Sequence, residues 1–191
     1  MVPMRIPAIT SHVVLLMFVL SATWTALVFL APALVPAGTL TDLSGVVGGH
    51  ENEDLFDDLS PIPHAVYWAG DAECHQIAER SFFINGNQMP FCSRDVGLFV
   101  GLAAASGVVT FVRYKVRPLL ALLGLVPIGL DGGLQMLTDY ESNNLLRVAT
   151  GLLAGVALAL LLAHFIFELQ EERPRPTAAA PVQPQGPPRQ P

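Results

Sequence analysis

Four long apolar stretches alternate with polar segments along the chain, at about residues 13–37, 96–112, 118–137 and 148–167. Each has about 17–25 residues, and a helix of that length spans the roughly 30 Å of hydrocarbon in a bilayer at 1.5 Å per residue. Open strands would leave backbone N–H and C=O groups unpaired in lipid, so helices are expected. The pattern predicts an all-α fold, an integral membrane bundle of four transmembrane helices over residues 13–167.

The polar segments divide the rest of the chain into a long loop and two ends. The loop, residues 38–95, lies between the first and second stretches, and its part up to residue 91 carries nine acidic residues against one arginine, Arg80. Such a run of like charges is typical of a solvated segment. The tail, residues 168–191, is rich in Pro, Ala and Gln and lacks the apolar residues needed to pack, which predicts disorder.

The first apolar stretch has two interpretations. Arg5 precedes it and small residues lie near Ala37, as in a secretory signal peptide. Its apolar run is longer than the roughly 7–15 residues of a signal peptide's apolar region. We therefore expect the stretch to be retained as the first transmembrane helix, with cleavage as the alternative.

The basic residues predict the orientation of the bundle. Of the 10 Lys and Arg residues, one side of a four-span topology receives seven and the other receives three. The seven are Arg5, Arg113, Lys115, Arg117, Arg173, Arg175 and Arg189, and the three are Arg80, Arg94 and Arg147. Because cytoplasmic loops carry the excess of Lys and Arg, we expect a multi-pass protein of the cell membrane. Its N-terminus (residues 1–12) and its tail are expected in the cytoplasm, and the long loop outside.

The composition agrees with a membrane location. Of the 191 residues, 52% are hydrophobic and only 14% are charged, which is more apolar surface than a soluble domain of this size needs. There is no basic stripe of the kind that binds nucleic acid, and two cysteines are too few for a disulfide-rich scaffold. The expected partners are the lipid bilayer and, for so small a bundle, a second copy or another membrane protein.

Three polar motifs lie at the predicted outer ends of the helices, in residues 73–97, 130–135 and 139–151. In the first, Cys74, His75, Cys92 and Asp95 offer two thiols, an imidazole and a carboxylate, a ligand set that zinc accepts. The alternative is a Cys74–Cys92 disulfide, because both cysteines are predicted outside, where oxidation is favoured. Both interpretations stay open.

Asp131 lies inside the third apolar stretch. An ionisable residue costs about 2.5–3.5 kcal/mol on insertion scales near the centre of a membrane helix. Gln135 lies four residues further on and shares its helical face. Arg94, Arg147 or a bound ion can neutralise the charge, so Asp131 is either half of a structural Asp–Arg pair or a residue with a substrate or metal role. Asp131 and Arg147 are the candidates for catalysis.

The outer polar residues also form a candidate substrate-binding set. Its members are Arg80, Arg94, Asp131, Gln135, Glu141, Asn144 and Arg147. Taken singly, Glu141, Asn144 and Arg147 are more typical of residues that cap a helix or solvate a short loop. Asn143 or Ser142 is a candidate N-cap for the fourth helix.

The polar motifs are similar to those of a known family. They are CHQ at 74–76, ERSFF at 79–83, CSR at 92–94, DGGLQ at 131–135 and ESNNLLRVATG at 141–151. This series resembles a family of small bacterial and archaeal membrane proteins of unassigned function, over about residues 70–160. The resemblance implies a further cysteine at the position of Asp95. Because aspartate can replace cysteine as a zinc ligand but not in a dithiol, the departure weakens dithiol chemistry and leaves a metal site open.

The motifs name no reaction. The sequence shows no phosphate-binding glycine loop, no His-Glu-x-x-His motif and no serine-nucleophile elbow. We therefore expect an integral membrane protein of unassigned role, with a polar cluster on its extracytoplasmic face that can bind a metal, zinc being the candidate. Two alternatives stay open: a membrane enzyme that acts on a lipid-linked or headgroup substrate at the outer leaflet, and a transporter subunit.

Overall fold

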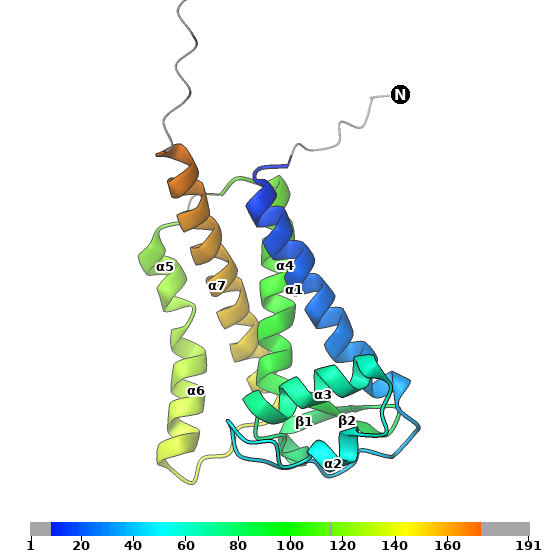
Figure 1. Cartoon of the computed structure of the whole chain (residues 1–191). Coiled ribbons are helices and arrows are strands. Elements are labelled where there is room, and N and C mark those ends of the chain that lie inside the picture. Colours follow the sequence, from blue (N-terminus) through cyan, green and yellow to red (C-terminus); the bar gives the residue numbers. More distant parts are fainter. Residues whose placement is uncertain (1–8, 115, 173–191) are drawn as a thin grey trace, which may run out of the picture.

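The computed structural model describes residues 9–114 and 116–172. Four long apolar spans run alongside one another, and a smaller folded unit covers one end of them (Figure 1). The first, second and fourth spans are built on α1 (His12–Leu30), α4 (Ser93–Phe111) and α7 (Asn144–Glu171). The third consists of α5 (Pro118–Leu123) and α6 (Val126–Leu137). The predicted helical fold with four membrane spans is confirmed.

The fourth span is longer than predicted at both ends. At its N-terminal end the Asn143 side chain accepts a hydrogen bond from Leu146 N–H at 2.9 Å and caps the helix. At its other end α7 continues to Glu171, within residues predicted to be tail, and Glu171 forms an ion pair with Arg113 at 2.8 Å. The rest of the predicted tail, residues 173–191, lies outside the described residues, as do Arg5, Lys115, Arg173, Arg175 and Arg189.

Glycines allow α4 and α7 to pack backbone against backbone. A Cβ atom on Gly151 would overlap the carbonyl oxygen of Arg94, and one on Gly155 would overlap that of Leu98. Small residues four apart permit this approach in membranes, where helix association depends on close packing rather than on burial from water. The glycine pair therefore serves the contact between these two helices, which fixes Arg94 on α4 next to the first turns of α7.

Residues 38–92, within the segment predicted to be a loop, fold into a unit that we call the cap (Figure 1). A 3-10 turn, η1 (Ala31–Leu34), leads into it from α1. The cap contains α2 (Glu53–Phe56), α3 (Pro61–Glu73), a 3-10 turn η2 (Ala78–Arg80) and the antiparallel strands β1 (Ser81–Ile84) and β2 (Asn87–Cys92). Asn85 and Gly86 join the strands with φ of 54° and 72°, as a tight two-residue hairpin turn requires. The membrane domain is all-α, and the cap adds this hairpin.

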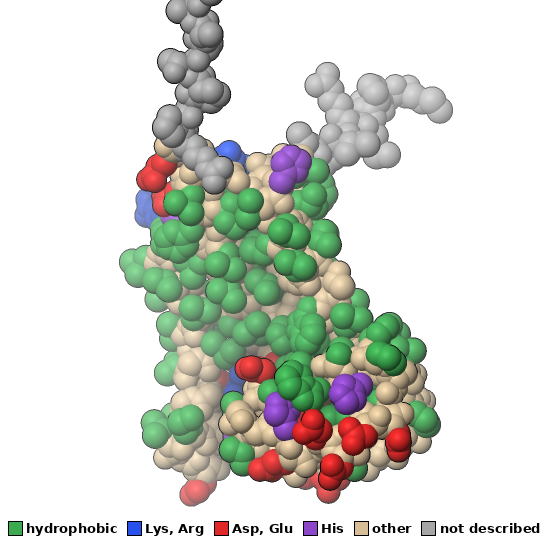
Figure 2. Space-filling view, in the orientation of Figure 1, with side chains coloured by type: hydrophobic (Ala, Val, Ile, Leu, Met, Phe, Trp, Pro, Cys, Tyr) green, Lys and Arg blue, Asp and Glu red, His purple; other side chains and the backbone are tan. Residues whose placement is uncertain are grey.

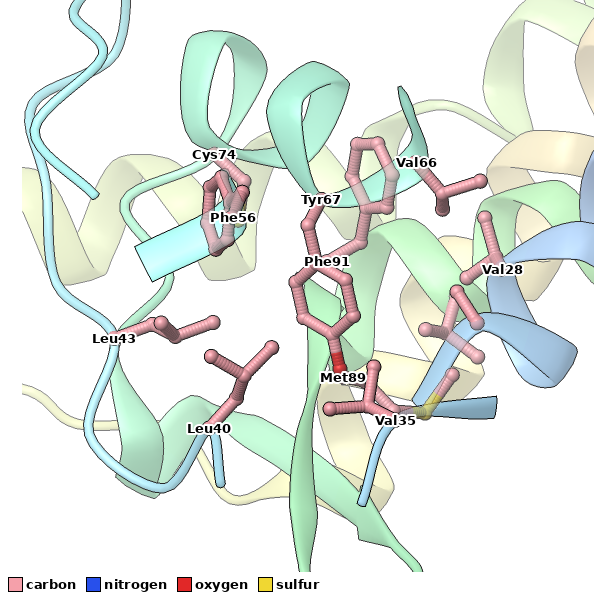
Figure 3. Packing of buried hydrophobic residues seen from close by; sticks show 12 residues of the cluster. Val28, Val35, Leu40, Leu43, Phe56, Val66, Tyr67, Cys74, Met89 and Phe91 are labelled. Atoms are coloured by element: carbon pink, nitrogen blue, oxygen red, sulfur yellow. The ribbon is translucent and has the colours of Figure 1, made fainter. Parts of the chain in front are cut away.

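The cap has a hydrophobic core that continues onto the end of α1 next to the cap (Figure 3). Its buried members include Val28, Val35, Leu40, Leu43, Phe56, Val66, Tyr67, Met89 and Phe91. Phe56 lies within the acidic run of residues 51–58 and is fully buried, so that run is anchored rather than simply solvated. Acidic side chains gather on the surface of the cap, and apolar ones cover the middle of the bundle (Figure 2).

Two buried amide side chains hold the coil at the start of the cap against the hairpin. Asn87 Oδ1 accepts hydrogen bonds from Thr39 N–H at 2.8 Å and Leu40 N–H at 3.0 Å. Gln88 Oε1 accepts one from Leu43 N–H at 3.0 Å. Buried backbone N–H groups need partners, and these side chains supply them where no third strand is present among the described residues. The hairpin, and with it Cys92, is thereby fixed against the end of the bundle.

Candidate functional site

Three metal-ligating side chains converge where the cap meets the N-terminal end of α4. Cys74 directly follows α3, Cys92 is the last residue of β2, and Asp95 lies in the first turn of α4. Their ligand atoms all lie within 4.8 Å of one another. The Cys92 thiol donates to Asp95 Oδ2 at 3.0 Å, and Cys92 N–H donates to Cys74 Sγ at 3.3 Å. This group, which we call the ligand cluster, can hold a metal ion.

The two thiols of the ligand cluster are not equivalent. Both cysteines are free, Cys74 being buried and Cys92 half-buried. The contact with the Cys92 side chain lowers the pKa of Cys74, whereas the same contact, burial and the Asp95 carboxylate raise the pKa of Cys92. Cys74 is therefore the first of the two to form a thiolate, the state that binds metals.

His75, the fourth predicted ligand, lies outside the ligand cluster. The residue is exposed, and its Nδ1 lies 3.1 Å from the carbonyl oxygen of Gly45. Neighbouring residues in an extended segment point in opposite directions, so a buried Cys74 turns His75 toward solvent. The structure brings together three of the four predicted ligands.

A second group of predicted residues meets at the carboxylate of Glu141, in the connection between α6 and α7. Arg80 donates to it from Nε and from an NH2 group, both at 2.9 Å. Arg147, in the first turn of α7, donates at 2.6 Å, and the Gln135 amide lies 3.1 Å from both oxygens. The hydrogen bonds from Arg80 and Arg147 lower the pKa of Glu141, which keeps it ionised. Capping and solvation therefore do not describe Glu141, since it joins three elements.

Asp131 is paired with Arg94. The carboxylate of Asp131, 4% exposed, accepts a hydrogen bond from an NH2 group of Arg94, which also donates to Gln135 Oε1 at 3.1 Å. The hydroxyls of Ser142 and Tyr140 lie 3.3 Å and 3.4 Å from the same carboxylate. The structural interpretation of Asp131 as half of an Asp–Arg pair is thus realised, and it links α6 to α4.

Asn144 connects the groups just described. Its Oδ1 accepts hydrogen bonds from Ser93 Oγ at 2.9 Å and from Arg147 NH1 at 3.2 Å, and its Nδ2 donates to the Ser81 carbonyl at 3.4 Å. Ser93 begins α4 and Ser81 begins β1, so one side chain holds α4, β1 and α7 together. Asn144 thereby helps to position Arg147.

The ligand cluster and the residues that bind Glu141 border one small pocket of about 80 Å³ between the cap and the nearby ends of the helices. A recess with charged side chains of both signs lies between the cap and α6 (Figure 2). The pocket is lined by Cys74, His75, Gln76, Ile77, Arg80, Cys92, Arg94, Gln135 and Arg147. Residues far apart in the sequence therefore face one site, as the predicted topology implied.

Gln76 belongs to this site, although the motifs did not single it out for a role. Its backbone is left-handed, with φ of 46°, and its fully buried amide donates to the Pro90 carbonyl at 3.0 Å. A positive φ costs a non-glycine residue free energy, so such a residue keeps it only where its surroundings hold it there. Gln76 thus sets the path of the chain directly after Cys74. In the sequence, the signal for Gln76 was its place as the third residue of the CHQ motif.

The chain matches one protein family and is similar to uncharacterized proteins. A family described as "Predicted membrane protein (DUF2085)" matches residues 74–161. An uncharacterized protein of Methanothermobacter thermautotrophicus is 41% identical over 103 residues, which are 50% of this chain and 92% of that protein. An uncharacterized protein of Methanocaldococcus jannaschii is 30% identical over 124 residues, 62% of this chain and 78% of that protein. No solved structure matches.

The matched segment contains the whole of the site. It begins at Cys74 and extends past Arg147, so it includes the ligand cluster, the Glu141 group and the Asp131–Arg94 pair. The N-terminal span and the greater part of the cap precede it. From these matches, the chain belongs to the DUF2085 family of predicted membrane proteins.

Proposed function

We propose that this membrane protein binds one divalent metal ion of the zinc type through Cys74, Cys92 and Asp95, at the extracytoplasmic end of its bundle. The observation that carries the proposal is the convergence of two thiols and a carboxylate, from α3, β2 and α4, within 4.8 Å. Zinc accepts sulfur and carboxylate oxygen together, whereas magnesium and calcium prefer oxygen alone. The mixed ligand set favours zinc.

Three protein ligands leave one position of a tetrahedral ion open. Structural zinc sites are usually closed by a fourth protein ligand, and catalytic ones keep the fourth position for water or substrate. His75 lines the same pocket and can fill that position if its side chain turns from Gly45. Without that rotation the fourth position of a bound ion would be left to water or a substrate, which would suit a reactive site better than a purely structural one.

The extracytoplasmic location rests on the charge distribution. The predicted cytoplasmic side has Arg113 and Arg117 among the described residues, at the end of the bundle opposite the cap (Figure 1). The cap carries an excess of acidic residues instead (Figure 2). Positive charge is retained in the cytoplasm during insertion, so this distribution supports a cap outside the cell.

The alternatives receive unequal support. A membrane enzyme that acts on a headgroup is supported by the three arginines that line the pocket beside the ligand cluster. A transporter subunit is supported less, because Asp131 and Gln135, the polar residues inside the third span, are both engaged by Arg94. A second copy of the chain or another membrane protein remains a proposed partner of the lipid-exposed helices.

The test is the metal content of protein purified in detergent without chelator. About one zinc per chain is expected, and Asp95→Ala or Cys92→Ala should reduce it strongly. Glu73→Gln, an exposed acid at the end of α3, is the control and should leave it unchanged. Thiols must lose protons to bind, so occupancy should fall as the pH is lowered.

One result would replace this proposal by the disulfide alternative. In that case no stoichiometric metal is present, and mass spectrometry without reduction shows a crosslink between Cys74 and Cys92 in freshly extracted membranes. Both thiols would then react with a maleimide only after reduction.

A further inference from the structure

The carboxylate of Glu141 is bound as a ligand would be. Five hydrogen bonds reach its two oxygens, from Arg80 on η2, Gln135 on α6 and Arg147 on α7. Arg80 donates two hydrogen bonds to it, and Arg147, on another element, donates a third. Two guanidinium groups with an amide are the donor set that proteins use for phosphate as well as for carboxylate, because an arginine fork matches both.

Arg147, one of the two cations of this group, is buried, and the anion is exposed. The side chain of Arg147 is 3% exposed, whereas that of Glu141 is 56% exposed. A buried guanidinium needs an anionic partner at all times, since leaving it unpaired is costly. Glu141 lies in a connection that is neither helix nor strand, so it can swing away without unwinding one. An anion from solvent can therefore exchange with Glu141.

The pocket beside this group has room and charge for such an anion. Its volume of about 80 Å³ exceeds by several-fold the roughly 10–15 Å³ that one water needs. Arg80, Arg94 and Arg147 line it, and no carboxylate is among its described lining residues. Arg94 also leaves its buried Nε without a hydrogen-bond partner in the described part of the chain. One donor of a residue that lines the pocket is thus left unused by the described protein groups.

We propose that Arg80, Gln135 and Arg147 form a receptor for a phosphate group, and that Glu141 occupies it as an internal competitor when phosphate is absent. A phosphate monoester carries about −1.5 to −2 at neutral pH, more than the single charge of a carboxylate, so it can displace Glu141. The end of the bundle where the receptor lies is also where lipid headgroups meet water. Both a lipid phosphate and free phosphate fit this chemistry. The receptor does not depend on a bound metal.

The test is a titration of the full chain with inorganic phosphate, in a detergent without phosphate, and with phosphatidic acid, in vesicles into which the chain is reconstituted. Glu141→Gln should raise the affinity for whichever probe binds by about tenfold, because the competing charge is lost while the shape is kept. Arg80→Gln should lower it by about tenfold, the loss of a charged hydrogen-bond partner. Arg113→Gln, at the opposite end of the bundle, is the matched control and should change nothing.

The outcomes separate the sources of phosphate and the two proposals. Binding of phosphatidic acid vesicles but not of inorganic phosphate assigns a lipid headgroup, and the reverse assigns a soluble phosphate. Protein stripped of metal by a chelator should still bind, so absence of zinc does not decide this question. Glu141→Gln is the decisive variant, since a network with only a structural role predicts weaker binding or none. If Glu141→Gln binds neither probe more tightly than the parent, the receptor is refuted.

Discussion

Asp131→Leu is expected to destabilise the protein by about 3 kcal/mol, although leucine suits an apolar helix far better than aspartate does. The substitution leaves the Arg94 guanidinium without its carboxylate. Removing one partner of a buried ion pair typically costs about 3–5 kcal/mol, because the remaining charge stays buried and unpaired. Arg94 is 21% exposed and keeps its hydrogen bond to Gln135, so the expected loss lies at the lower end of that range.

The measurement is reversible unfolding of the full chain in mixed detergent micelles, in a double-mutant cycle. Asp131→Leu and Arg94→Met should each be destabilising, and the double variant should recover most of the loss, since two apolar groups replace the pair. Met136→Leu, a volume-conserving change at an 85% exposed position of the same helix, is the control. Asp131→Asn separates charge from shape and should lie between the parent and the leucine variant.

Additivity would refute this reasoning. If the two single changes sum to the effect of the double change, Asp131 and Arg94 do not stabilise each other and the contact between them carries no energy. A second contradiction would be an Asp131→Leu protein as stable as the parent. In that case the free-energy cost of placing Asp131 in the membrane would cancel the stabilisation from its pairing with Arg94.

Two further predictions concern the bundle as a whole. Gly155→Leu should weaken the contact between α4 and α7 by at least the roughly 1–3 kcal/mol that overpacking a core costs. Gly133→Leu, at a position with open space around it, should leave the stability unchanged. Unfolding in micelles measures both. A reporter fused after Arg175 should lie in the cytoplasm and one inserted near Asp54 outside. Finding both reporters on one side would contradict the four-span topology.

The membrane helices could be predicted because lipid simplifies the problem. A helix in hydrocarbon satisfies its own backbone groups, so length and apolar composition alone identify it. The break between α5 and α6 was harder to predict from the sequence. It falls at Gly124 and Leu125 inside a continuous apolar stretch, and a Cβ on Gly124 would overlap the Ala157 side chain of α7. The chain also contributes to the break, because Pro127, in the first turn of α6, has no N–H to donate to the Leu123 carbonyl, a signal that apolar periodicity does not report.

The cap could not be predicted in the same way. Its core joins Leu40, Phe56, Tyr67 and Met89, which come from four short apolar runs that are individually too brief to identify. The acidic residues between them gave the segment the composition of a solvated loop. Its coil is fixed by buried amides such as Asn87, and an isolated asparagine in a sequence carries no sign of burial.

The sequence predicted which residues form the candidate site better than it predicted how they are arranged. Topology placed the motifs on one face, and charge compensation suggested Arg94 as a partner of Asp131. The role of Glu141 was missed, because its partner Arg80 lies 61 positions away and only the folded cap brings η2 to the start of α7. His75 was included because it follows Cys74, but adjacency in the chain turns the two side chains apart.

The ligand cluster and the proposed phosphate receptor border one pocket, since Cys74 and Cys92 line it together with Arg80 and Arg147. A zinc ion held by two thiolates and a carboxylate adds two positive charges near the three arginines, while its ligands supply three negative ones. The bound ion therefore offers an open, electrophilic position rather than extra net charge. A phosphate oxygen that reaches this position would bind more tightly to the zinc-loaded protein than to the stripped one, and by linkage zinc would be held more tightly in turn. Equal phosphate affinities in the loaded and chelator-treated protein would mean that metal and anion share a pocket without touching. A higher affinity in the loaded protein would favour the enzyme alternative, because a metal that contacts a phosphate oxygen can polarise it for attack.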